Sequence, residues 1–286
     1  MVQIWPTIFM IHNMSICINE WNSRQWHFGS FRKFKSGKEP DPYDNTKISR
    51  FNGDSTSEWV FKGDGVMNMR GRAPRLYLEN YYYNTENTLY YKKNTNKGRD
   101  PDGIIFAARS SFNGHLKNDK INNNNWMNTQ TYYGRIRHDG HVQICKEQIH
   151  GQKFVCYPTK KKYLYEDKRR LPKNKWIGMK FIVANICSNK VLLQLWVDKK
   201  SNAEEFEMRE KNNWELLLEI VDQYGSFPSS DNEKVILYKL DRNLPFLNPG
   251  MIFIRNGEIT SGESLYKYIS IREIELTKEI KEKYLS

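Results

Sequence analysis

Short apolar runs recur along the chain, and clusters of Gly, Asn, Asp and Pro separate them. Several runs alternate between apolar and polar positions, most clearly at 191–198 (VLLQLWVD) and 269–274 (ISIREI). A period of two residues is that of a β-strand with one buried face, and frequent turn signals between such runs indicate a sandwich or a barrel. We therefore predict strands at 58–61, 65–69, 75–79, 88–92, 103–109, 132–137, 141–146, 176–185, 191–198, 214–222, 250–255 and 266–273.

The segments between these runs carry turn sequences and few helical signals. Sequences that favour tight turns stand at 62–65 (KGDG), 102–103 (DG), 139–140 (DG) and 256–257 (NG). Two segments have helix-forming composition, 203–211 and 277–285. Two polar segments, 113–130 and 159–175, are long enough to be loops of their own.

No repeat, heptad run or linker divides the sequence. We predict one domain at 50–276, preceded by an N-terminal strand and lead-in segment at 1–49 and followed by a helical tail at 277–286. The first residues lack the basic start and clean apolar core of an export signal, and they fall short of the roughly 20 apolar residues that a membrane span needs. They are interpreted either as a first strand with its lead-in or as the remnant of a poorly formed export signal. No later stretch is long and apolar enough to span a membrane, so no membrane span is expected.

Composition adds two leads. The chain has 286 residues with 17 Tyr, 14 Phe and 8 Trp, which suits half-buried strands and also suits contact with the C–H faces of sugars. Its 45 Lys+Arg against 33 Asp+Glu give a formal net charge of +12. A basic surface attracts polyanions, so nucleic acid, an anionic membrane and an acidic polysaccharide all qualify as partners.

The four cysteines, Cys17, Cys145, Cys156 and Cys187, form no CxxC pair and no His/Cys ligand spacing, which argues against a structural zinc site. Cys145 and Cys156 flank an expected turn. They can form a disulfide or stay as buried thiols.

Several segments together resemble a known fold family. The runs 59–67 and 74–78, then 108–110 and 133–140 leading into 146–150, resemble concanavalin A-like jelly rolls related to polysaccharide lyases. The later runs 175–180 and 195–199 resemble the paired strands of laminin G-like sandwiches, and 271–274 fits a closing strand. The resemblance implies an all-β jelly-roll β-sandwich of two antiparallel sheets with short peripheral helices. It also implies an extracellular or cell-surface location and a carbohydrate ligand.

Lyases of the alginate lyase and glucuronan lyase type carry three motifs in order, and this sequence offers counterparts. They are Arg75, the literal Gln148-Ile149-His150, and the run 250–256. In the last run Phe253 and Arg255 occupy the stretch where the family has a catalytic Tyr.

The chemistry explains why these residue types matter. β-Elimination needs a donor to neutralise the uronate carboxylate, a base to remove the neighbouring proton and an acid for the leaving oxygen. Gln148 and His150 are two apart and share one face of a strand, which suits a donor and a base. His150 is equally well read as the polar end of a strand before Gly151. Among many tyrosines, Tyr133 is the preferred acid because it shares strand parity with Arg135 and Arg137.

Other arginines complete the predicted substrate-binding set of Arg75, Arg109, Arg135, Arg137 and Arg255. Guanidinium groups grip carboxylates in bidentate fashion. Arg75 is equally an ordinary cation at a strand edge, and Arg109 either pairs with an internal Glu or binds a uronate. The neighbouring Lys146 and Glu147 are interpreted as an ordinary surface salt bridge.

Three functions stay open. The first is a protein that binds a polysaccharide, expected to be acidic, in a concave cleft, with cleavage by β-elimination left open as its activity. The second is a non-catalytic lectin-like carbohydrate-binding module, and the third is nucleic-acid binding through a basic surface. The last ranks lowest because no dense basic stripe exists beyond 160–162 and 168–170. Paired carboxylates in the ExDxE spacing, nucleophile elbows and phosphate loops are absent from the sequence. No cofactor is expected, apart from a structural calcium ion that sequence does not reveal, and we expect a monomer.

Overall fold

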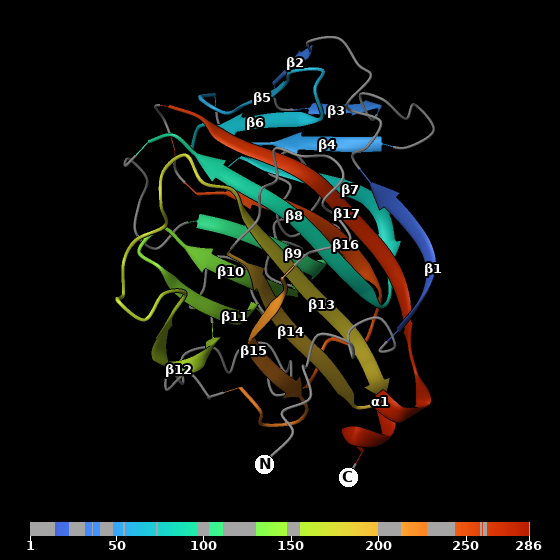
Figure 1. The fold of residues 1–286 in the computed structure, drawn as a ribbon. Coiled ribbons are helices and arrows are strands. Elements are labelled where there is room, and N and C mark those ends of the chain that lie inside the picture. The colour runs from blue at the N-terminus through green and yellow to red at the C-terminus, as the bar shows by residue number, and fades with distance from the viewer. Residues whose placement is uncertain are drawn as a thin grey trace, which may run out of the picture.

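The computed structural model describes residues 15–22, 32–35, 37–40, 48–53, 55–72, 74–95, 103–110, 130–147, 155–199, 213–227, 244–257, 259 and 262–285. Within these ranges the chain forms two antiparallel sheets that lie face to face, with one short helix beside them (Figure 1). No helix among the described residues is long and apolar enough to cross a membrane.

The nine-stranded sheet follows the order β15 (Glu215–Asp222), β14 (Lys190–Asp198), β13 (Ile177–Cys187), β8 (Thr85–Lys93), β17 (Ser264–Leu276), β6 (Val66–Arg70), β5 (Glu58–Phe61) and β2 (Arg32–Phe34). The remaining strand, β1 (Ser15–Asn22), pairs with the C-terminal half of β17. The eight-stranded sheet follows the order β12 (Val155–Tyr163), β11 (His141–Glu147), β10 (Thr131–Arg137), β9 (Gly103–Ser110), β16 (Gly250–Asn256), β7 (Arg75–Tyr82), β4 (Ile48–Asn52) and β3 (Gly37–Pro40). The helix is α1 (Lys278–Lys283).

The connectivity is that of a jelly roll. Successive strands from β6 to β9 cross from one sheet to the other. The last two strands then enter between these early strands: β16 lies between β7 and β9, and β17 lies between β6 and β8. The predicted all-β jelly-roll sandwich is thus confirmed, and every strand predicted from the alternating runs is present.

Alternation along the strands builds the core. On β13 the side chains of Met179, Phe181 and Val183 point between the sheets, whereas Ile182 and Ala184 face outward. The outward side chains are buried as well, because Ile280 and Tyr284 of the C-terminal segment pack with them. This second layer explains why the strand sequence is almost continuously apolar.

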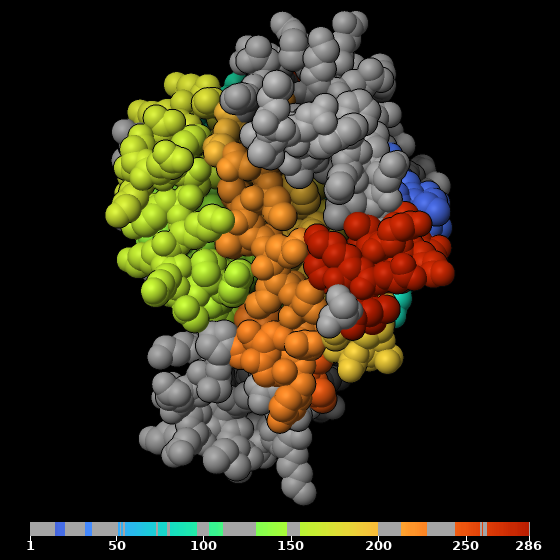
Figure 2. Space-filling view, turned by 60° about the horizontal axis from the view of Figure 1, so that its bottom comes forward, coloured from blue at the N-terminus to red at the C-terminus, as the bar shows by residue number. Residues whose placement is uncertain are grey.

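One predicted loop is partly wrong. The first residues of 159–175 belong to β12, which pairs with β11 along the edge of the eight-stranded sheet. Lys160 and Lys161 are exposed there, as is typical of an edge strand protected against further pairing. Lys162 donates a 2.6 Å hydrogen bond to the Leu217 carbonyl of β15, which joins the edges of the two sheets. Figure 2 shows the segment around β12 in yellow-green against β15 in orange.

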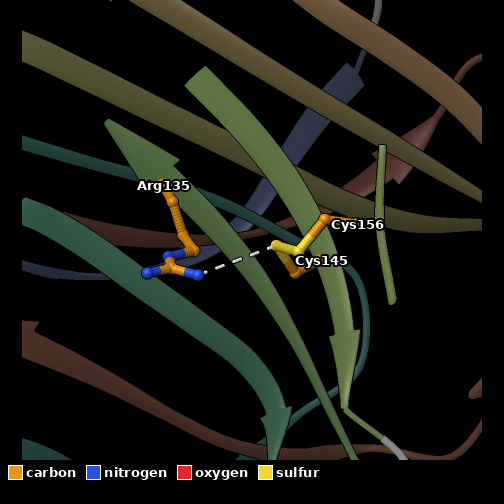
Figure 3. Close-up of a disulfide and its surroundings, with 3 residues drawn as sticks. All are labelled: Arg135, Cys145 and Cys156. Carbon is orange, nitrogen blue, oxygen red and sulfur yellow. Dashed lines mark hydrogen bonds between the residues drawn. A yellow bond between two sulfur atoms is a disulfide. The ribbon is translucent and has the colours of Figure 1, made fainter. Parts of the chain in front are cut away.

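A disulfide joins Cys145 to Cys156, which settles the alternatives left open by the sequence. The two residues lie directly opposite each other on β11 and β12, with 4.1 Å between their Cα atoms. The bond therefore fixes the edge strand to its neighbour (Figure 3).

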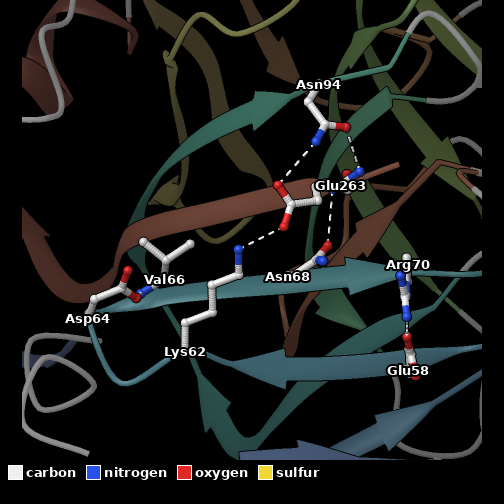
Figure 4. A network of polar contacts seen from close by, with 9 residues as sticks. Glu58, Lys62, Asp64, Val66, Asn68, Arg70, Asn94 and Glu263 are labelled. Atoms are coloured by element: carbon white, nitrogen blue, oxygen red, sulfur yellow. Dashed lines mark hydrogen bonds and ion pairs between the residues drawn. The ribbon is translucent and has the colours of Figure 1, made fainter. Parts of the chain in front are cut away.

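The turn at 62–65 shows why its sequence predicts a tight turn. Gly63 and Gly65 adopt φ values of 83° and 76°, which favour glycine, and the Asp64 carboxylate accepts a 3.1 Å bond from the Val66 amide. Next to the turn, Glu263 accepts from Lys62 at 2.7 Å and from the side-chain amide of Asn94 at 3.1 Å (Figure 4). These bonds connect the turn to the start of β17.

The outer segments are described in part. Strand β1 lies in the predicted lead-in, and α1 lies in the predicted helical tail at 277–285. The expected helix at 203–211 lies outside the described residues, as does the expected loop at 113–130 except for Gln130.

Candidate functional site

The predicted site residues gather on the outer face of the eight-stranded sheet. Alternation on β9 separates the two faces: Ile104 and Phe106 point into the main core, whereas Ile105 and Ala107 belong to a separate cluster on the outside. The same alternation on β10 sends Tyr132 inward and Tyr133 outward. We call this side the outer face.

Three of the predicted arginines form one row across the outer face. Arg135 of β10 and Arg255 of β16 both pair with Ile105 of β9, and Arg255 also pairs with Arg75 of β7. The three side chains therefore lie at one level of the sheet, across four neighbouring strands. Each is half-buried. We call Arg135, Arg255 and Arg75 the arginine row.

The next level of the same face is aromatic. Tyr133 pairs with Ala107, Ala107 with Phe253, and Phe253 with Tyr77. The Phe253 ring lies 4.7 Å from the Tyr77 ring and 5.9 Å from the Tyr133 ring between centroids. At most 3% of any of these three side chains is exposed. They form a packed floor beside the arginines.

The disulfide continues this aromatic level at the β12 edge. Cys145 pairs with Tyr133 on one side and with Cys156 on the other. A terminal nitrogen of Arg135 lies 4.0 Å from the Cys145 sulfur, so the disulfide lies beside one end of the arginine row (Figure 3).

Tyr133 is held by a carboxylate. Its hydroxyl donates a short hydrogen bond to Glu147, and both side chains are buried. Burial, and then the charge of Glu147, raise the pKa of Tyr133 well above its usual value, while the nearby Arg75 lowers it. Tyr133 therefore keeps its proton at neutral pH and does not serve as a base.

Arg137 lies two residues beyond Arg135 on β10 and has a local partner. Its guanidinium binds the Asp139 carboxylate at 2.6 Å, and the same carboxylate accepts from the His141 ring at 3.0 Å. Burial raises the pKa of Asp139, but the hydrogen bonds from Arg137 and from the His141 amide lower that pKa by more than burial raises it, so the net shift is downward. This group closes the turn between β10 and β11.

Arg109 does not join the arginine row. Its buried guanidinium donates to the Phe246 carbonyl at 2.5 Å, to the Tyr83 carbonyl at 2.9 Å and to the Asn84 side chain at 3.2 Å. Burial lowers the pKa of Arg109 to about 10, so it stays charged at neutral pH. Arg109 thereby joins the turn between β7 and β8 to the segment before β16. None of these partners is the internal glutamate that the sequence analysis expected.

The interpretation of Lys146 and Glu147 as a surface salt bridge is wrong. The two side chains point to opposite faces of β11, and both are buried. Lys146 faces the core and pairs with Asp222 at 2.8 Å, whereas Glu147 faces outward to Tyr133. Neighbouring residues on a strand cannot reach each other across the sheet, which is the physical reason for the error.

Gln148 and His150 lie outside the described residues, so their placement as donor and base stays a prediction. Three other residues lie on this face in roles that the sequence did not indicate: Glu147 accepts from Tyr133, and Tyr77 and Phe253 pack beside it. Tyr77 and Phe253 have the strand parity of Arg75 and Arg255, which is a signal for this face, whereas Glu147 shares parity with Cys145 on β11. No group of three His, Cys, Asp or Glu side chains suited to a metal ion occurs among the residues that the structure describes.

Comparison with known proteins gives fold similarity only. No family model matches the sequence, and a search of curated proteins found no match. The calcium-bound exoplasmic/lumenal domain of VIP36 is similar in structure with a TM-score of 0.43 and 7% identity, over 80% of this chain and 84% of that one. The metal-free carbohydrate recognition domain of Emp46p gives 0.43 and 10%, over 79% and 88%. Peanut lectin in complex with a peptide gives 0.42 and 9%, over 86% and 98%. Similarity at this level assigns no ligand to this chain.

Proposed function

We propose that this protein binds an acidic polysaccharide on the outer face of its eight-stranded sheet, without cleaving it. The observation that carries the proposal is the arginine row, in register across neighbouring strands and beside a packed aromatic floor. The net charge of +12 acts in the same direction by attracting polyanions to the surface.

The composition of the row favours a carboxylate or sulfate ligand. Arg255 and Arg75 are direct neighbours on adjacent strands, and like charges in that position repel. An anion between them relieves the repulsion and accepts hydrogen bonds from both guanidinium groups. The Nε of Arg75 has no acceptor among the described residues, so this guanidinium keeps an unused donor. Guanidinium groups hold carboxylates and other oxyanions in this way.

The length of the row favours a polymer. With strands about 4.8 Å apart, the first and last arginines are separated by three strand spacings, or about 14 Å. That distance exceeds one sugar ring and suits a chain that presents several acidic groups. Because the rings of the aromatic floor are buried, the ligand contacts the arginines and the rim of the face, while the floor keeps the row in place.

Lyase activity is the second candidate, favoured by the placement of Tyr133 on the same face as the arginine row. Against it, Tyr133 is buried and bound to Glu147, and its raised pKa makes proton donation to a leaving group less favourable. Incubation with alginate, glucuronan and polygalacturonate, followed by absorbance of the unsaturated product, tests it. Product formation that disappears in His150→Ala supports the lyase; its absence together with measurable binding supports the binding module.

The binding itself is tested with matched variants. In the first, Arg75, Arg135 and Arg255 are all changed to Gln. In the second, three exposed arginines elsewhere, Arg72, Arg169 and Arg170, are changed to Gln, so both variants lose the same charge. Affinity electrophoresis in gels containing polygalacturonate or alginate should show binding lost in the first variant and retained in the second. Equal losses would mean that only net charge matters, and strong retardation by DNA but by no polysaccharide would favour nucleic-acid binding.

A further inference from the structure

A groove opens at the end of the sandwich near α1, away from the arginine row. It has a volume of about 640 Å³. Its walls come from the β7–β8 turn, the end of β13 and the turn that follows, β17, β1 and α1. Figure 2 looks at this end and shows blue β1, the red C-terminal segment and the yellow turn after β13 close together.

Tyr83 forms one wall of the groove and is held firmly in place. The residue is 47% exposed, although it is held on several sides. Its carbonyl accepts from Arg109, its hydroxyl accepts a 2.5 Å bond from the side-chain amide of Asn185, and the Arg109 guanidinium lies 5.4 Å from its ring. A ring fixed before binding loses little freedom when a ligand contacts it.

Three polar groups of the groove keep unused hydrogen-bonding capacity among the described residues. The Tyr83 hydroxyl accepts one bond and still has its proton to donate. The Asn84 side-chain oxygen accepts from Arg109 and from the Asn185 amide, which orients the Asn84 nitrogen but leaves it without an acceptor. The Glu273 carboxylate has no described hydrogen-bond or ion-pair partner.

We propose that this groove binds a neutral saccharide as a second site, independent of the acidic-polysaccharide site. One face of the Tyr83 ring can cover the C–H face of a pyranose. The carboxylate of Glu273 accepts from adjacent hydroxyls, and the Asn84 nitrogen and the Tyr83 hydroxyl donate to hydroxyl oxygens. A uronate fits less well, because the described lining of this groove has two carboxylates, Glu273 and Glu275, and one cation, Lys281.

The test uses saturation-transfer NMR with the methyl glycosides of mannose, glucose and galactose and with N-acetylglucosamine. At least one should bind the full chain at millimolar concentration. Tyr83→Ala should weaken that binding at least tenfold, and Glu273→Gln should weaken it severalfold while leaving the thermal unfolding midpoint unchanged. Tyr224→Ala, which removes a similarly exposed ring outside the groove, should leave binding unchanged.

Two outcomes would overturn the second site: no binding of any of these sugars, or binding that survives both Tyr83→Ala and Glu273→Gln. If Tyr83→Ala fails to fold, Glu273→Gln alone decides, because no described partner depends on that carboxylate. The arginine-row variant should keep neutral-sugar binding, and Glu273→Gln should keep polyuronate binding. The two proposals can therefore fail separately.

Discussion

The buried pair of Lys146 and Asp222 gives the sharpest prediction about stability. Only 2% of Lys146 and 0% of Asp222 side chain is exposed, and 2.8 Å separates the ammonium from the carboxylate. Lys146 also donates to the Leu244 carbonyl at 2.7 Å, and Tyr132 donates to Asp222. Lys146→Met keeps most of the side-chain volume but leaves the carboxylate without its cation.

Removing one partner of a buried ion pair costs about 3–5 kcal/mol. The Tyr132 bond survives the change and places the expected loss near the lower end, at about 3 kcal/mol. Total stabilities of domains are about 5–15 kcal/mol, so the loss is a large fraction. Adding Asp222→Asn to Lys146→Met should restore part of the stability, because the second change removes the uncompensated charge.

The pH dependence has a definite sign. Burial raises the pKa of Asp222, and the bond to Lys146 opposes that rise. The folded state therefore holds this proton more tightly than the unfolded state does, which favours folding at low pH and is lost as the pH rises through the raised pKa. In Lys146→Met the opposing cation is gone, so its stability deficit should shrink as the pH falls toward the Asp222 pKa.

Guanidinium unfolding followed by fluorescence at several pH values measures both effects. If Lys146→Met lowers the free energy of unfolding by less than about 1 kcal/mol at neutral pH, which is the contribution of an exposed ion pair, the pair is not buried as described. A deficit that does not change with pH would refute the assignment of the charge to Asp222.

Other perturbations test the remaining parts of the structure. Changing Cys145 and Cys156 to Ser opens a loop with a sequence separation of 11 and should cost about 3 kcal/mol, measured by unfolding with and without reductant; equal stability in both conditions would argue against the bond. Arg109→Met leaves the buried Phe246 carbonyl and the partly buried Tyr83 carbonyl without their donor, and should cost at least about 2 kcal/mol in the same assay, whereas a neutral result would contradict its structural role. Asp139→Asn should lower stability above the depressed pKa of Asp139 and have little effect below it, since its bond to Arg137 needs the charged carboxylate; a loss independent of pH would contradict this account.

The sequence predicts the strands well because alternation and turn chemistry are local. The strands at 58–61 and 191–198 can be predicted from adjacent residues alone. The KGDG turn can be predicted from its two glycines, which adopt the positive φ values that the turn requires. Parity also placed Tyr133 and Arg135 on one face correctly, because side chains alternate along a regular strand such as β10.

Pairing between strands is not local, and this limited the prediction of the site. Arg75 and Arg255 are distant in sequence, and only the insertion of β16 between β7 and β9 makes them neighbours. Arg109 lies apart from the arginine row. Its positive φ of 55° accompanies an irregularity in the pairing of β9 with β16. Burial of Lys146 and Glu147 depends on what packs over each face, which the sequence of β11 alone does not show.

The salt dependence of polygalacturonate binding tests most directly whether the arginine row binds an acidic polymer. Ion-pair contacts make affinity fall as salt rises, with a slope that grows with the number of contacts. We predict a steep slope for the wild-type protein, an equally steep slope when Arg72, Arg169 and Arg170 are changed to Gln, and a clearly shallower slope when Arg75, Arg135 and Arg255 are changed to Gln. A slope that the arginine-row variant leaves unchanged would contradict binding through these arginines.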